Sequence, residues 1–367
     1  MSRNGKIAKY VGEGEVGFGS TEFIVFRGRD NVTTTEYAHY LATDPGFRSF
    51  AISKMTGSSG RQRVPVDALE HYWVRVPPLV EQRSITKILG DLDDKIALLR
   101  DMNRTLEDIA CAVFRAWFVD FEPVRAKIVG ATSFRGMPQD LFDDLPIHFQ
   151  RSDIGDIPSG WSLQPVIDQA NWINGAAYKN MHFSNAPDAL PVVKIAELKK
   201  GISTNTQFTN TELGDKYRIA TGDLMFSWSG SPETSIDAFI WASGNAWLNQ
   251  HIFVVRPNGK KSLGYLFVLL KHLKPTFIQI AKNKQTTGLG HVTRDDMARL
   301  FVCEPSEQLV AWFGNFSQGL YDRILNNLVE IETLASLRDT LLPKLISGEL
   351  AAPSLEALGL KAAGDGG

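Results

Sequence analysis

The chain has 367 residues, 43% of them hydrophobic and 22% charged, a balance typical of a protein with two or three globular domains. A formal net charge of -2 excludes binding of polyanions through overall charge, so any such contact needs a local basic patch. Two cysteines, Cys111 and Cys303, support neither a disulfide framework nor a zinc site, and no other metal site is expected. Because no apolar run approaches about 18 residues and no signal peptide is evident, a cytoplasmic location is expected.

Residues 1–78 are expected to form the first domain. Patterns of apolar and turn residues predict a strand at residues 23–26, a helix at 35–41, a loop at 56–63, a short helix at 66–69 and a closing strand at 71–76.

Residues 79–120 are expected to form a long helix. Its apolar positions step by four and three residues: Ile85, Leu89, Leu92, Ile96, Leu99, Asn103, Leu106, Ala110, Val113 and Trp117. That step is a heptad repeat, so one stripe of the helix is apolar and should pack against a partner helix.

The rest of the chain divides into four further segments. Residues 121–151 contain Pro, Gly and Asp and are expected to be a connector. Residues 152–305 are expected to form a complete α/β (α+β) domain, since short apolar runs alternate with Gly, Pro, Asn and Asp turns. Residues 306–348 are expected to form a second long helix, and residues 349–367 a disordered tail.

The second half of the chain repeats the first at a distance of 228 residues, in its domain as well as in its helix. The matching elements are a strand at 252–256, a helix at 265–270, a loop at 286–291, a short helix at 294–300 and a closing strand at 300–303. The segment 153–229 has no counterpart upstream. The first domain is therefore expected to be a truncated copy of the second.

Two long helices with matching stripes should pair, and the intervening domain lets them run antiparallel. Setting Asn103 opposite Asn327 places an amide against an amide, which penalises shifted alignments. The same register sets Leu99 opposite Ile331 and Leu106 opposite Ile324. It also sets Leu92 opposite Arg338, which is the poor layer of this alignment.

Two motifs match the residue patterns of cofactor-binding or catalytic sites, but their contexts disfavour such a role. The run Gly12-Glu13-Gly14-Glu15-Val16-Gly17 fits a dinucleotide-binding fingerprint, yet residues from Phe18 onward read as a strand rather than the required helix. Asp188, Glu197 and Lys199 spell the carboxylate and lysine pattern of a metal-dependent PD-(D/E)xK-like nuclease, a short motif that recurs by chance. Neither a P-loop nor a methyltransferase motif is present. We therefore assign no catalytic residues.

Five stretches in and around the helices have distinctive sequences: PPLVEQ at 77–82, LDDKI at 92–96, NRTLE at 103–107, WFVDF at 117–121 and LRDTLLPKLISG at 337–348. Together they resemble the specificity subunits of type I restriction-modification systems, over about residues 18–350. In that family, two target-recognition domains alternate with two long spacer helices.

The resemblance implies a non-catalytic, DNA-binding specificity subunit that recognises part of a bipartite site. The implied partners are double-stranded DNA, two methyltransferase (modification) subunits and a restriction/translocase subunit, with no membrane. S-adenosylmethionine, ATP and Mg²⁺ are expected on the partner subunits and none on this chain. A coiled-coil scaffold that never touches DNA remains an alternative, and the nuclease a weaker one.

The candidate DNA contacts are basic, amide and hydroxyl residues on loops, because lysines and hydroxyls meet phosphates while Arg, Gln and Asn read base edges. The main group lies around Gly288 and Gly290: Lys282, Lys284, Gln285, Thr286, Thr287, His291 and Arg294. The corresponding loop of the first domain offers Arg61, Gln62 and Arg63. Secondary candidates are Lys194, Lys199, Lys200, Asn205 and Trp228. A solvated loop is the plain alternative for the main group.

Overall fold

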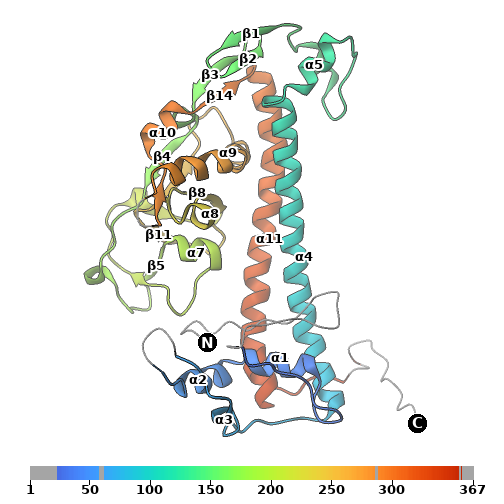
Figure 1. Cartoon of the computed structure of the whole chain (residues 1–367), viewed down its shortest axis with the longest axis vertical. Coiled ribbons are helices and arrows are strands. Elements are labelled where there is room, and N and C mark those ends of the chain that lie inside the picture. Colours follow the sequence, from blue (N-terminus) through green and yellow to red (C-terminus); the bar gives the residue numbers. More distant parts are fainter. Residues whose placement is uncertain (1–22, 58–61, 286–287, 355–356, 358–367) are drawn as a thin grey trace. The chain divides into compact units, whose positions relative to one another are not determined.

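The computed structural model describes residues 23–57, 62–285, 288–354 and 357. The chain falls into two compact units: a larger unit, Leu99–Glu332, and a smaller unit that combines Met1–Leu98 with Thr333–Gly367. Two long helices, α4 (Leu79–Phe118) and α11 (Glu307–Ser347), contribute to each unit (Figure 1). None of the helices in the described ranges is long and apolar enough to cross a membrane.

Two four-stranded sheets form the body of the larger unit. The first is fully antiparallel, in the order β10 (Asp237–Ile240), β8 (Leu224–Ser227), β12 (Ile252–Arg256) and β4 (Asn171–Asn174). The second has the order β6 (Phe208–Thr209), β5 (Leu190–Val193), β11 (Ala246–Leu248) and β7 (Arg218–Ile219), and its β11–β5 pair is parallel. The strands are short and their inward side chains are buried.

The described residues also form three two-stranded sheets: β1 (Phe149–Ser152) with β2 (Gly155–Pro158), β3 (Ser162–Pro165) with β14 (Phe301–Glu304), and β9 (Ser229–Gly230) with β13 (Gly290–His291). The remaining helices of this unit are α5 (Glu122–Ile128), α6 (Gln139–Asp143), α7 (Ile195–Lys200), α8 (Pro232–Ser235), α9 (Leu263–Asn283) and α10 (Arg294–Arg299), with 3₁₀ turns at Val166–Gln169, Asn180–His182 and Asp215–Tyr217.

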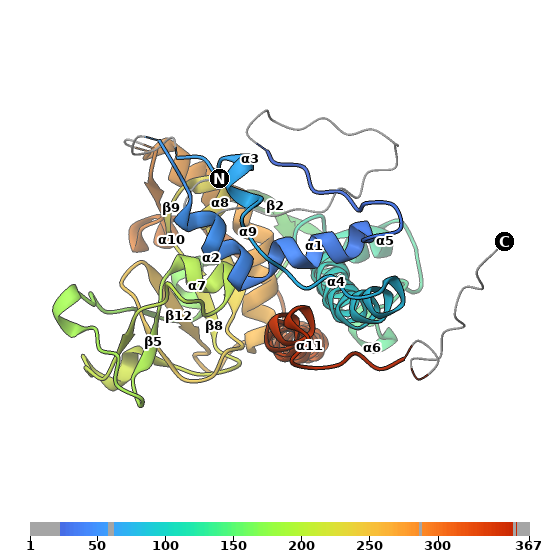
Figure 2. The ribbon, with the colours of Figure 1, turned by 90° about the horizontal axis from the view of Figure 1, so that it is seen from below.

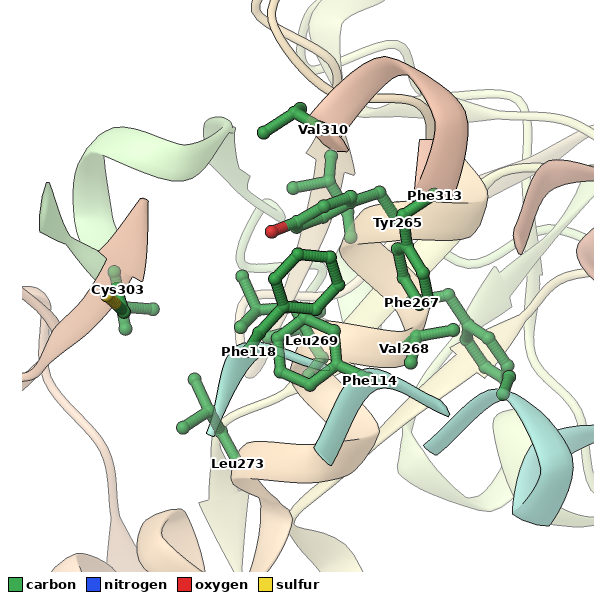
Figure 3. Packing of buried hydrophobic residues seen from close by; sticks show 14 of the residues in the cluster. Phe114, Phe118, Tyr265, Phe267, Val268, Leu269, Leu273, Cys303, Val310 and Phe313 are labelled. Carbon is green, nitrogen blue, oxygen red and sulfur yellow. The ribbon is translucent and has the colours of Figure 1, made fainter. Parts of the chain in front are cut away.

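Helix α9 joins the first sheet to the helix pair. On one side, the ring of Phe277 lies 4.8 Å from that of Phe226 in β8. On the other, Tyr265 contacts Phe114 and Phe118 of α4 and Phe313 of α11, as Figure 3 shows. This continuous apolar core joins the first sheet and α9 to the long helices within the larger unit, since aromatic pairs of this kind contribute beyond their buried area.

Inside the larger unit, α4 and α11 pack antiparallel. Trp117 stacks on Trp312 with ring centroids 4.9 Å apart, and farther along Nδ2 of Asn327 donates to Oδ1 of Asn103 at 2.7 Å. These are the two amides that the sequence places opposite each other. Flanking them, Leu99, Ile331 and Ile324 are buried and Leu106 is half-buried.

The smaller unit packs α1 (Thr35–Thr43) against the antiparallel ends of the same helices, which Figure 2 views end-on. Its apolar cluster joins Tyr37 and Tyr40 of α1 to residues of both long helices, including Ile85, Leu89 and Leu345. The described part of this unit also contains helices α2 (Pro45–Ser53) and α3 (Val66–Leu69).

The layer that was expected to be poor, Leu92 opposite Arg338, contains an ion pair that the heptad repeat did not indicate. Nη1 of Arg338 donates to Oδ1 of Asp93 at 2.7 Å, and the other oxygen of Asp93 accepts from the Tyr40 hydroxyl at 2.9 Å. Arg338 therefore reaches a carboxylate instead of facing Leu92 without a partner.

The 228-residue repeat is visible in the helix starts. Thr34 caps α1 by accepting from the N–H of Tyr37, and Ser262 caps α9 by accepting from the N–H of Tyr265. The short helices α3 and α10 also start 228 residues apart, and so do α4 and α11. The predicted helices at 35–41, 66–69, 265–270 and 294–300 are confirmed, and α9 is longer than expected.

The two strands predicted in the first domain are wrong. Residues 23–26 and 71–76 contain no strand, and Trp73 is 94% exposed. Their equivalents, β12 and β14, pair with β4, β8 and β3, all of which lie in the segment without an upstream counterpart. Without those partners, an apolar run has no ladder to join.

The connector is also more structured than expected. It carries α5, α6 and β1, and Phe121, Val124 and Phe142 are buried in the core of the larger unit. Proline and glycine in this segment therefore mark turns between short elements rather than an open linker.

In the smaller unit, Gln82 is fully buried and satisfies three main-chain groups. Its Oε1 accepts from the N–H of Thr34 at 3.0 Å, and its Nε2 donates to the carbonyls of Val32 and Pro77, each at 2.8 Å. We expect Gln82→Ala to destabilise this unit by about 2 kcal/mol, because these groups lose their partner. Hydrogen exchange of the α1 amides measures the effect. The exposed neighbour Arg83→Ala is the control, and equal protection in both variants would contradict the prediction.

Candidate nucleic-acid interface

The small sheet of β9 and β13 brings two candidate residues together. His291 pairs with Ser229, and the N–H of Val292 donates to the carbonyl of Trp228 at 2.8 Å. A Cβ at Gly290 would lie 2.3 Å from the carbonyl oxygen of Ala281, so only glycine permits this approach. His291 is therefore held beside Trp228, although 63 residues separate them in the sequence.

Arg294 joins this group from the first turn of α10. Its guanidinium lies 5.9 Å from the ring centroid of Phe253 and donates to the carbonyl of Trp172 at 3.0 Å. Helix α10 starts at Arg294 because Thr293 and Asp296 form a reciprocal capping box. Phe253 also lies 5.9 Å from Trp228, so the arginine and the indole flank one aromatic ring.

Trp228 connects these residues to the end of β4. Its Nε1 donates to Oδ1 of Asn174 at 2.9 Å, and its ring lies 5.7 Å from that of His251. Gln250, next to His251, is exposed, as are Asn174 and His251 themselves. We define the polar face of the larger unit as Asn174, Trp228, Gln250, His251, His291 and Arg294.

An open pocket of about 570 Å³ adjoins the polar face. Asn174 and Gln250 line it, together with Lys179, His182 and Tyr217. None of the described residues that line it is acidic. A pocket lined by amides and a lysine suits an anionic ligand that forms hydrogen bonds.

Two of the predicted lysines lie in ion pairs. Lys282 pairs with Glu233 of α8, and Lys284 donates to both oxygens of Asp296 at 2.6 and 2.7 Å. Burial alone would raise the pKa of Asp296, but hydrogen bonds from Lys284 and Thr293 outweigh it and hold the pKa below its usual value. Gln285 is exposed, and Thr286 and Thr287 lie outside the described residues.

The secondary candidates gather around α7, whose first residue, Ile195, packs near Gly230 of β9. Nζ of Lys194 bonds to Gln207 and lies 5.2 Å from the Phe183 ring, so this lysine is engaged within the domain. Lys199, Lys200 and Asn205 are exposed. Only Trp228 among the secondary group belongs to the polar face.

The first-domain loop belongs to the smaller unit. Arg63 is exposed and forms an isolated antiparallel bridge with Thr56, while Gln62 is half-buried. Arg61 lies outside the described residues, as does the glycine-rich run at residues 12–17.

Sequence reasoning missed Asn174, Lys179, Gln250 and His251. The polar triplet of residues 249–251 interrupts two apolar runs that become β11 and β12, and this interruption could have marked a surface turn. Nothing local links that turn to Asn174. The link is made by topology, through the pairing of β4 with β12.

The carboxylates of the nuclease motif do not converge on one site. Glu197 is buried and accepts from the N–H of Lys194 and the hydroxyl of Thr206, so it caps α7. Asp188 is exposed and accepts from Nδ2 of Asn210 at 2.7 Å. Among the described residues, no group of three His, Cys, Asp or Glu side chains is arranged to hold a metal ion.

The larger unit is an α/β domain joined to a pair of long helices, and the helices recur with the 228-residue repeat. This is the architecture that the sequence led us to expect of a DNA specificity protein with two repeats. Residues 2–108 and 158–308 match the family model of the type I restriction modification DNA specificity domain. Because these ranges cover more than half of the chain, the chain belongs to this family.

Two curated relatives and one solved structure are similar to this chain. The specificity subunit of the type I restriction enzyme HindI from Haemophilus influenzae is 24% identical over 375 residues, covering 90% of this chain and 81% of the relative. The MjaIX specificity subunit from Methanocaldococcus jannaschii is 26% identical over 333 residues, covering 88% and 70%. A type I restriction-modification S subunit from M. genitalium has a TM-score of 0.46 at 14% identity, covering 85% of this chain and 72% of that one.

Membership confirms the resemblance, the fold class and the specificity role expected from the sequence. Specificity subunits are the non-catalytic members of type I systems, so the non-catalytic assignment is confirmed and the nuclease and scaffold alternatives are not favoured.

Proposed function

We propose that the polar face of the larger unit contacts one part of a bipartite site on double-stranded DNA. The observation that carries the proposal is the convergence of Trp228, His291 and Arg294 from β8–β9, β13 and α10 beside two exposed amides. Arginine and amides are the side chains that read base edges, and Lys179 at the adjoining pocket suits a phosphate. Arg294 and Lys179 supply the local positive charge that the net charge of -2 makes necessary.

The proposal extends to an assembly. We propose that the long helices dock two methyltransferase subunits, which bind S-adenosylmethionine, and that a restriction/translocase subunit using ATP and Mg²⁺ joins them, in the cytoplasm. A pull-down with the methyltransferase subunit of a type I restriction-modification system from the same organism tests the first contact. Failure to retain a correctly folded methyltransferase would contradict the assembly but leave DNA binding open.

DNA binding is tested by enriching bound duplexes from a randomised pool with the full chain. Affinity for the enriched duplex is then measured between about 50 and 200 mM salt, where released counterions give a steep dependence. A recurring sequence among bound duplexes supports the proposal. Binding that is neither sequence-selective nor salt-dependent would overturn it.

Lys179→Ala should weaken binding to all duplexes alike and reduce the slope of log affinity against log salt by about 0.9, the contribution of one phosphate contact. Lys260→Ala is the matched control, because Lys260 is also exposed but lies on the turn before α9, outside the pocket lining. An equal loss of slope in both variants would indicate a diffuse charge effect and remove Lys179 from the interface.

A further inference from the structure

The hydrogen bond between Trp228 and Asn174 fixes the orientation of an exposed amide. An indole N–H can only donate, so the Asn174 atom that lies 2.9 Å from Nε1 must be the carbonyl oxygen Oδ1. The amino group, Nδ2, then forms the other end of the amide. Within the described part of the chain, Nδ2 of Asn174 has no hydrogen-bond partner, and Asn174 is exposed. The side chain thus presents a donor to solvent.

Trp228 is itself held firmly enough to act as a fixed donor. Its ring packs against those of His251 and Phe253, at centroid distances of 5.7 and 5.9 Å, and it is half-buried against the apolar core. The Trp228 main chain is tied as well, since its carbonyl accepts from the N–H of Val292. An amide that is already bonded to such a group loses little conformational entropy when it binds a ligand.

The main chain places Asn174 at the pocket mouth next to a second amide. A Cβ at Gly175 would lie 2.1 Å from the carbonyl oxygen of Asn249, so glycine allows the end of β4 to touch the turn that carries Gln250. The N–H of Gly175 donates to the carbonyl of Ile252 at 3.0 Å, and that of Ala176 to the carbonyl of Leu248 at 2.9 Å. Asn174 and Gln250 consequently line the same pocket.

We propose that Asn174 is a base-reading residue and that Trp228 is the positioning residue that makes it a donor. The inference rests on the proposed function, because it names which group of the polar face reads a base. In the major groove, guanine offers the acceptors O6 and N7, adenine offers N7, and thymine offers O4. Cytosine offers only its N4 amino donor. A donor held at Nδ2 can therefore bond to guanine, adenine or thymine at one position of the site, whereas cytosine has no acceptor for it there.

Three variants of the full chain test this assignment in the duplex selection described above. Trp228→Phe keeps the ring but removes the N–H, so the amide can turn over and accept from cytosine. Asn174→Asp keeps an oxygen for the Trp228 bond and replaces the outward donor by an acceptor, which suits cytosine N4. Trp241→Phe is the control, because the Trp241 N–H donates to the main-chain carbonyl of Gly244 rather than to an exposed side chain.

The expected result concerns a single base position. The unaltered chain depletes cytosine there, Trp228→Phe reduces that depletion about tenfold, and Asn174→Asp shifts the position toward cytosine. Preferences elsewhere in the site and those of Trp241→Phe stay unchanged. If Trp228→Phe loses fold or binding, Asn174→Asp decides, since its exposed carboxylate replaces an amide of the same shape.

Two outcomes overturn the inference in distinguishable ways. If the unaltered chain enriches a sequence but Asn174→Asp, with unchanged thermal unfolding, enriches the same one, Asn174 reads no base and the proposed function stands. If the unaltered chain enriches no sequence at all, the proposed function fails and this inference fails with it.

Discussion

Asn103→Leu should lower the free energy of unfolding of the larger unit by about 2 kcal/mol, although it adds an apolar side chain to an apolar stripe. Asn327 is 1% exposed and its Nδ2 donates to Asn103 at 2.7 Å. Leucine cannot accept that bond, so a buried amide loses its partner, which costs about 1 to 3 kcal/mol. Urea unfolding followed by tryptophan fluorescence measures the change, since seven of the eight tryptophans, all but Trp73, lie in this unit.

A double-mutant cycle separates the amide pair from simple burial. Asn327→Leu alone should cost a similar amount, whereas Asn103→Leu combined with Asn327→Leu should recover the loss, because both polar groups are gone. Thr105→Leu, at an exposed position two residues along α4, is the control for adding leucine. Additive losses in the double variant would show that the two amides do not act as a pair.

The long helices and their pairing could be predicted from the sequence because the signal is local and periodic. A heptad repeat needs only neighbouring residues, and two asparagines 224 positions apart, one in each apolar stripe, are enough to set a register. Caps are equally local. Thr34, Ser262 and Thr293 each start a helix within three residues of their hydrogen-bond partners.

Strands in the first domain could not be predicted because a strand depends on partners elsewhere in the chain. Residues 252–256 form β12 between β8 and β4, while the similar run at 23–26 has no such neighbours among the described residues and is irregular. Apolar alternation identifies a segment that can pair, not one that does.

The candidate interface was only partly predictable for the same reason. His291 and Arg294 were found by their residue type on a glycine-rich loop, but Lys282 and Lys284 meet Glu233 and Asp296, and only the fold shows these pairings. Asn174 carries no local sign of its role. The base-reading role proposed for it depends on Trp228, 54 residues away, which reaches it across β12.

Lys271→Met should cost the larger unit about 3 kcal/mol. Nζ of Lys271 lies 3.2 Å from a carboxylate oxygen of Glu107 on α4 and 3.2 Å from one of Asp237 on β10, so one side chain of α9 joins the long helix to the first sheet. Burial alone would lower the pKa of Lys271, but the two carboxylates outweigh it and hold the pKa above its usual value. The lysine is therefore charged, and its removal leaves the half-buried carboxylate of Glu107 without its cationic partner, whereas Asp237 keeps Lys274.

Lys274→Met is the matched control for this prediction. Lys274 is one turn farther along α9, bonds to Asp237 at 2.5 Å with no second partner among the described residues, and is 35% exposed. Its loss should therefore cost less than about 1 kcal/mol. The two variants lose the same charge and the same kind of side chain, and the same unfolding measurement compares them. Equal destabilisation would mean that net charge matters rather than the bridge to Glu107. A larger loss for Lys271→Met would identify this lysine as the polar link that orients the recognition domain on α4, alongside the apolar core that Tyr265 and Phe313 share.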